Sequence, residues 1–157
     1  MIELTSLETE VIGLFVHQAR LLNIPKSVAE IYGLLFIAPE PLAMEDIIGR
    51  LNLSKGSASQ GLKLLRGLGA VQVVYVGGKR NDHYEAETEL RKLVNGFLKD
   101  KLEPHFHTGG ERLSRIETLA KEAPSTNGDI VLARLEKLKS WEQTGRAFLP
   151  MALKCLG

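Results

Sequence analysis

The chain has 157 residues, of which 44% are hydrophobic and 25% are charged, as in an ordinary globular protein rather than a disordered one. A core of this size needs no disulfide, and the single cysteine, Cys155, excludes an internal one, which fits a reducing compartment. The first ten residues are acidic, and no apolar run approaches the roughly 20 residues that span a bilayer. We therefore expect no secretory signal, no membrane span and a cytoplasmic location.

The first half of the chain begins with helical patterns. Thr5 and Glu8 have the spacing of a capping box, and apolar residues then recur at helical intervals to about residue 22. A second helix is expected between Pro25 and Pro39, and a short extended link begins at Leu42. Residues 44–51 have an apolar face and predict a third helix.

A fourth helix and a hairpin are expected next. Ser54 is a good N-cap for a helix over residues 55–68, and Gly69 stands where a left-handed residue commonly ends a helix. Residues 71–76 are rich in β-branched side chains and predict a strand. Residues 79–82 then form the expected hairpin tip, and residues 83–86 the returning strand.

The second half of the chain is predicted to be helical with two interruptions. An apolar stripe begins near residue 88 and is expected to end near Pro104, with a loop over residues 108–110. A further helix over residues 113–123 is followed by a second loop over residues 124–128. The last helix begins near residue 129, and Pro150 is expected to kink or end it.

Basic residues are concentrated in the middle of the chain, although the net charge is only +1. No Asp or Glu occurs from Ile47 to Asn81. Six of the 20 basic residues lie there, which leaves 14 basic against 19 acidic residues elsewhere. The six are Arg50, Lys55, Lys63, Arg66, Lys79 and Arg80. A concentrated basic segment on an otherwise acidic chain indicates a surface that binds a polyanion.

The order of the predicted elements is that of a winged helix-turn-helix, in a mainly α protein with a small β-wing. In this motif the second helix of the pair enters the major groove with its N-terminal residues, which here are small, polar and basic. Ser57, Ser59 and Gln60 suit base edges, Lys55 and Lys63 suit phosphates or guanine, and Lys79 and Arg80 stand at the wing tip. Gly56 and Gly61 are explained equally well by close approach to DNA and by packing.

The segment over residues 24–105 resembles the GbsR-like branch of the MarR superfamily of transcriptional regulators. The phrases SKGSASQG at residues 54–61 and DHYEAE at residues 82–87 carry the likeness. The resemblance implies a cytoplasmic, homodimeric repressor, in some members responsive to a small molecule. It also implies contacts to double-stranded DNA by the helix and the wing. The residues concerned are Ser54, Lys55, Gly56, Ser57, Ser59, Gln60, Lys63, Lys79 and Arg80. Asp82 departs from more basic wings.

A homodimer is also expected on physical grounds, because two-fold proteins read two half-sites about one DNA turn apart. The sequence predicts a DNA-binding domain over residues 25–88, with dimerisation helices in residues 1–24 and 89–157. Their apolar stripes exceed what one small winged-helix core can cover, so we expect them to pair across a two-fold axis.

Other interpretations remain open. The same fold serves as a protein-interaction module without DNA, which an apolar, uncharged face on residues 55–68 would indicate. The neighbouring His105 and His107 suggest a metal site but are better explained as exposed residues, and Cys155 is expected to be packed and inert. Phe15, Tyr32, Phe36 and Trp141 fit either an effector pocket or the core. No enzyme signature and no cofactor motif occurs, so we expect neither catalysis nor a bound cofactor or metal. The operator and the effector are not encoded in any motif.

Overall fold

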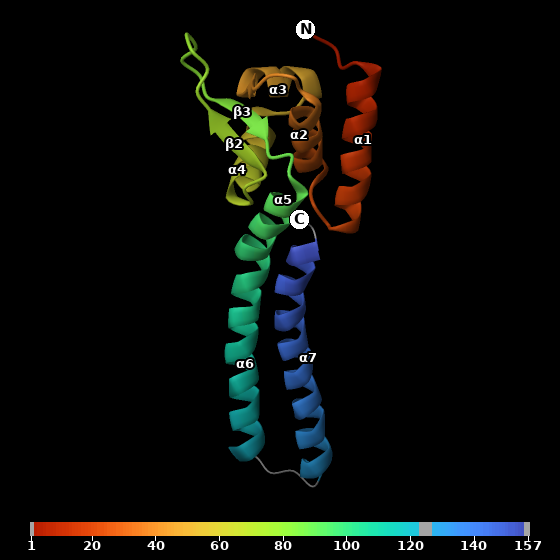
Figure 1. Ribbon diagram of the computed structural model, residues 1–157, viewed down its shortest axis with the longest axis vertical. Helices are drawn as coiled ribbons and strands as arrows, with labels where there is room; N and C mark the ends of the chain where they lie inside the picture. The colour runs from red at the N-terminus through yellow and green to blue at the C-terminus, as the bar shows by residue number, and fades with distance from the viewer. Residues whose placement is uncertain (1, 123–126, 156–157) are drawn as a thin grey trace. The chain divides into compact units, whose positions relative to one another are not determined.

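The computed structural model describes residues 2–122 and 127–155. The chain divides into two compact units, Met1–Gly96 and Phe97–Gly157. The first unit holds helices and a small sheet, and the second consists of helices (Figure 1). Within the described residues, no helix is both long and apolar enough to cross a membrane.

Two packed helices open the first unit. Helix α1 (Ser6–Leu21) has the predicted capping box: the Glu8 N–H donates to Thr5 Oγ1 at 3.2 Å, and the Thr5 N–H donates to Glu8 Oε2 at 2.7 Å. Helix α2 (Lys26–Ile37) lies against α1 and is the most apolar helix of the unit. The α2 side chains Ile31 and Leu34 are completely buried, so α2 is the centre of the core.

The predicted helix pair follows and matches its expected bounds closely. Helix α3 (Met44–Leu51) ends at Asn52, whose φ of 52° lies in the left-handed region, and α4 (Lys55–Gly67) begins after Ser54. Gly69 has a φ of 71°, as predicted for the residue that ends α4. The two helices pack on each other and on α2, with Ile47 and Leu62 in the shared core.

A three-stranded antiparallel sheet completes the winged part of the unit. Strand β1 (Leu42–Ala43), β2 (Val71–Val74) and β3 (His83–Ala86) have the order β1-β3-β2. Val74 pairs with His83 and Ala43 pairs with His83 from the other side, so β3 is the central strand. This mostly helical unit with a small antiparallel sheet is consistent with the predicted winged helix.

The second half of the chain corrects two expectations. Helix α5 (Leu90–Phe97) runs into a π-helical segment, η1 (Leu98–Leu102), and then into α6 (Glu103–Glu122), so the chain stays helical through Pro104 and through residues 108–110. Pro104 is the second residue of α6, within the turn that follows the π-helical segment, so its missing N–H lies close to the change of hydrogen-bond pattern.

The glycines at 109 and 110 lie within α6 rather than in a loop, and Gly110 faces a helix contact. Helix α7 (Gly128–Cys155) packs against α6, and a Cβ at Gly110 would lie 3.0 Å from Arg146 Nη2. Arg146 Nη2 donates to the Phe106 carbonyl at 2.7 Å. Gly110 therefore leaves room for Arg146 to reach the α6 backbone.

The end of the chain also departs from expectation. Helix α7 does not end at Pro150 but continues to Cys155, whose side chain is exposed rather than packed. Most of the loop expected over residues 124–128 lies outside the described residues, and α7 begins at Gly128.

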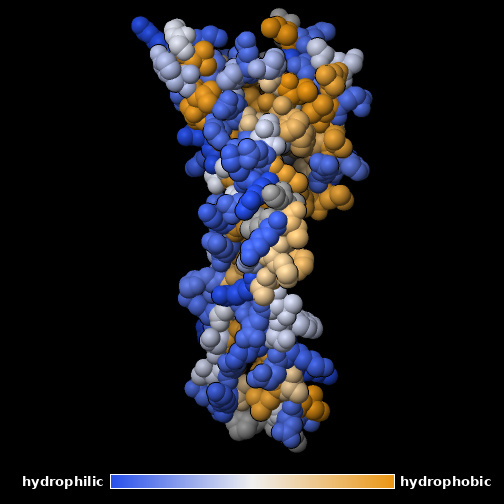
Figure 2. All heavy atoms as spheres, in the orientation of Figure 1, coloured by the Kyte–Doolittle hydropathy of each residue, from blue (hydrophilic) through white to orange (hydrophobic). Residues whose placement is uncertain are grey.

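Each unit keeps an apolar stripe on its surface. On α1, Leu7, Leu14 and Leu21 are 63%, 55% and 80% exposed, and their spacing of two helical turns places them on one face. Figure 2 shows hydrophobic residues gathered over this helix. Helix α7 has a comparable exposed stripe of Leu138, Trp141, Phe148 and Met151.

Candidate nucleic-acid interface

The N-terminus of α4 is organised by two serines. The Ser57 N–H donates to Ser54 Oγ at 3.1 Å, which makes Ser54 the N-cap that the sequence predicts. The Ser54 hydroxyl in turn donates to Ser57 Oγ at 2.9 Å. Ser54 is therefore satisfied within the helix, whereas the Ser57 hydroxyl keeps its own hydrogen for an outside acceptor.

One face of α4 is polar and exposed along its length. Ala58, Gly61, Leu62 and Leu65 are buried, so the helix is fixed by its opposite side. The exposed residues recur at helical spacing and include most of the predicted contact residues. They are Lys55, Gly56, Ser59, Gln60, Lys63, Arg66 and Gly67. Ser57 is partly exposed beside them.

The two glycines of α4 have different surroundings. A Cβ at Gly61 would lie 2.6 Å from Ile31 Cδ1, so Gly61 is required for the packing of α4 on α2. A Cβ at Gly56 would meet nothing within 4 Å, and this exposed glycine leaves the backbone of the first turn accessible. Packing therefore explains the glycine at position 61. Of the two, only Gly56 is placed to let a ligand approach the backbone closely.

The wing carries the other two predicted contact residues. Lys79 and Arg80 are exposed in the segment between β2 and β3, after Gly78, which has a φ of 80°. A hydrogen bond from the Lys79 N–H to the Val76 carbonyl at 3.2 Å closes the turn. Across the described part of the chain, no ion pair is formed by Lys55, Lys63, Arg66, Lys79 or Arg80.

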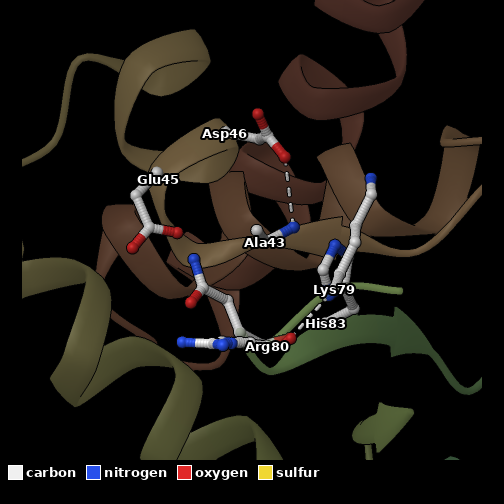
Figure 3. Close-up of a pocket in the computed structure, with 7 residues that line it drawn as sticks. Ala43, Glu45, Asp46, Lys79, Arg80 and His83 are labelled. Carbon is white, nitrogen blue, oxygen red and sulfur yellow. Dashed lines mark hydrogen bonds between the residues drawn. The ribbon is translucent and has the colours of Figure 1, made fainter. Parts of the chain in front are cut away.

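A hollow lies between the wing and the start of α3. It has a volume of about 440 Å³, and Figure 3 shows the carboxylates of Glu45 and Asp46 among its lining residues, together with Lys79 and Arg80. Asp46 Oδ2 accepts from the Ala43 N–H at 3.3 Å, so this carboxylate is partly engaged. The acids at α3 make this side of the wing less favourable for a phosphate than the α4 side.

Arg50 does not belong to the exposed basic surface, contrary to the sequence prediction of six unopposed cations. Its Nη2 lies 2.6 Å from Glu8 Oε1, and the two side chains are 14% and 12% exposed. The partner is 42 residues away in the sequence, outside the stretch that lacks acids. Five of the six cations therefore remain exposed and free of ion pairs.

The remaining candidates lie elsewhere. His105 and His107 are exposed on α6, where His107 Nε2 lies 3.3 Å from Glu111 Oε1. The residues that the structure describes contain no group of three or more potential ligands placed to hold a metal. Phe15, Tyr32 and Phe36 pack edge-on or tilted against one another, with ring centroids 5.0–6.1 Å apart, whereas Trp141 is exposed on α7. The first three therefore form one aromatic cluster between α1 and α2.

Comparison with known proteins gives a likeness in fold. No family model and no curated protein matches the sequence. A solved crystal structure of a transcriptional regulator superposes with a TM-score of 0.62 over 94% of this chain and 95% of that chain, at 16% sequence identity. The two proteins share a fold.

Proposed function

We propose that this protein is a sequence-specific DNA-binding transcriptional regulator that acts as a homodimer. The observation that carries the proposal is the row of exposed, unpaired cations along α4 and the wing beside a helix N-terminus built from small polar residues. Such a surface neutralises phosphates while it lets the helix sink into the major groove. The shared fold with a transcriptional regulator supports the same class.

Each residue of the surface has a role in this proposal. Lys55, Lys63, Lys79 and Arg80 contact phosphates, and Gln60 with Ser59 reads base edges. Ser57 donates its free hydroxyl hydrogen, Gly56 permits close approach of the backbone, and Ser54 supports both as the N-cap. Arg66, exposed one turn after Lys63, extends the phosphate surface.

The likeness to the GbsR-like branch of the MarR superfamily supports a finer proposal. In it, residues 25–88 bind DNA and residues 1–24 and 89–157 form the dimer, which acts as a cytoplasmic repressor by occupying an operator. The exposed stripes on α1 and on α7 support pairing, since contiguous apolar surface of this kind is typical of an interface. Two α4 helices about one DNA turn apart then read a palindromic site.

A protein-interaction module without DNA binding is the competing function. It requires an apolar recognition face, but among the described residues of α4 no large hydrophobic side chain is exposed. The basic, polar α4 surface therefore favours DNA over a protein partner.

Selection of bound duplexes from a random pool tests the proposal. We expect enrichment of a palindrome with half-sites centred about one helical turn apart. Light scattering on the same preparation should give the mass of two chains at micromolar concentration. Recovery of unrelated sequences, with binding no stronger than to the input pool, would contradict sequence-specific recognition.

A further inference from the structure

A partly buried ion pair ties α1 to α3 inside the first unit. Arg50 Nη2 donates to Glu8 Oε1 at 2.6 Å, with side chains 14% and 12% exposed. In every other ion pair of the described chain at least one side chain is 23% exposed or more. A partly buried pair is weakened less by salt than the exposed pairs on the surface.

The carboxylate of Glu8 is held in place from its own helix. The Thr5 N–H donates to Oε2 at 2.7 Å while Arg50 donates to Oε1, so each oxygen has its own donor. The backbone hydrogen bond from Thr5, helped by the Arg50 guanidinium, lowers the pKa of Glu8 below its usual value. Glu8 is therefore an ionised, oriented acceptor at the start of α1.

The pair is expected to add little to the stability of the core. Arg50 Nε is buried and has no hydrogen-bond partner, which costs free energy that an apolar side chain would avoid. Replacing buried ion pairs by well-packed apolar residues is often neutral or stabilising. The Glu8–Arg50 contact is better understood by the geometry that it imposes than by the stability that it adds.

That geometry bears on the α4 surface. Arg50 lies in the last turn of α3, two residues before the left-handed Asn52 that leads the chain into α4. Helices α3 and α4 pack on each other, so a fixed position for the end of α3 also fixes the start of α4. Glu8 belongs to α1, whose outer face carries the leucine stripe.

We infer that Glu8 and Arg50 are a positioning pair that holds the start of α4 in a fixed relation to α1, and that Arg50 is not a DNA contact. The inference rests on the proposed function, in which α4 binds DNA and α1 contributes to the dimer. In such a dimer the pair sets the spacing of the two α4 helices, because it connects the surface where the copies meet to the helix that each one inserts.

Three variants test the inference: Glu8→Gln, Arg50→Gln and the double variant. Gln at position 8 still suits a capping box, so Glu8→Gln removes the charge but not the cap. Lys26→Gln is the matched control, because it breaks the exposed Lys26–Glu30 pair on α2. Binding to the selected duplex is measured by fluorescence anisotropy at several salt concentrations, at a temperature where circular dichroism shows every variant folded.

Each single variant is expected to weaken binding about tenfold, with the double variant no weaker than either single one. The slope of log K against log salt should stay unchanged, and Arg50→Lys should restore part of the affinity. Lys26→Gln should bind as the parent does. Should Arg50→Gln reduce the slope by about two, one contact from each copy, while Glu8→Gln binds as tightly as the parent, Arg50 is a phosphate contact and the inference is wrong.

A second readout is independent of DNA. Amide hydrogen exchange in residues 44–67 should quicken in both single variants, because the end of α3 loses its attachment to α1. Unchanged exchange there overturns the inference whether or not DNA binds. A parent protein that binds no duplex, with exchange quickened in both variants, contradicts the proposed function and leaves the pair as the attachment between α1 and α3.

Discussion

Ser54 and Ser57 exchange two hydrogen bonds at the start of α4: the Ser57 N–H donates to Ser54 Oγ at 3.1 Å, and the Ser54 hydroxyl donates to Ser57 Oγ at 2.9 Å. Loss of the Ser54 hydroxyl and loss of the Ser57 hydroxyl should therefore have different consequences. Ser54→Ala removes the cap and should lower the free energy of unfolding by about 1 kcal/mol. Ser57→Ala should change stability little but weaken DNA binding, because it removes the free donor. Thermal melts and anisotropy titrations separate the two, and a Ser57→Ala variant that binds normally would rule out this contact.

Gly61 is expected to tolerate no side chain. A Cβ there would lie 2.6 Å from the buried Ile31 Cδ1, so Gly61→Ala should lower the free energy of unfolding by about 1–3 kcal/mol. Gly49→Ala is the control, since Gly49 lies inside α3 with open space around it. That variant should gain up to about 1 kcal/mol from helix propensity. Urea unfolding of both variants measures the difference, and equal stabilities would contradict the packing account.

Tyr32 should make stability fall at alkaline pH. Its hydroxyl donates to the Glu87 carbonyl at 2.6 Å, and burial, with the nearby Glu87 charge, raises its pKa to about 12. The hydroxyl therefore loses its proton in the unfolded state first, near pH 10.0. Tyr32 makes its full contribution to the free energy of unfolding below that pH, and this contribution is lost as the pH rises toward about 12. The loss reaches at most about 1.4 kcal/mol per pH unit.

Urea unfolding between about pH 8 and pH 11 measures this dependence. In Tyr32→Phe the free energy of unfolding should fall less steeply with pH. Some dependence should remain, because burial also raises the pKa of Tyr84. A decline as steep in Tyr32→Phe as in the parent would assign the effect to other groups.

Gln60 should read one base. Its side chain is exposed one turn after Gly56, on the polar face of α4. Gln60→Ala should relax the preference at a single position of each half-site, at a cost of about 1–3 kcal/mol for the preferred duplex. Gln143→Ala, at an exposed position on α7, is the control, and repeated selection from the random pool is the measurement. If the selected DNA sequence stays unchanged in Gln60→Ala, Gln60 does not contact a base.

Trp141 should contribute to the dimer. It is 69% exposed on α7 between Leu138 and Phe148, on one helix face. Trp141→Asp should raise the dissociation constant of the dimer by more than about tenfold, because a charge would have to be desolvated at the interface. Gln143→Asp, at an exposed position nearby, should change it little. Sedimentation velocity over a dilution series measures both, and equal constants would place the interface elsewhere.

Local signals in the sequence predicted the first unit well. The capping box at Thr5, the N-cap at Ser54 and the left-handed Gly69 each depend on residues within a few positions, and all three are present. The contacts of Arg50 and Gly110 depend instead on distant residues. Arg50 pairs with Glu8, and Gly110 makes room for Arg146, so neither the loss of one cation nor the continuity of α6 follows from local patterns.

The salt dependence of DNA binding tests the central claim most directly. The triple variant Lys63→Gln, Lys79→Gln, Arg80→Gln removes three proposed phosphate contacts, and Lys26→Gln, Lys99→Gln, Lys121→Gln removes the same charge from other parts of the chain. The homodimer carries each substitution twice and so loses six proposed phosphate contacts. Anisotropy titrations with the selected duplex should show a slope of log K against log salt that is shallower by about 5.4 in the first variant and nearly unchanged in the second. Equal slopes in the two variants would contradict a DNA-binding surface on α4 and the wing.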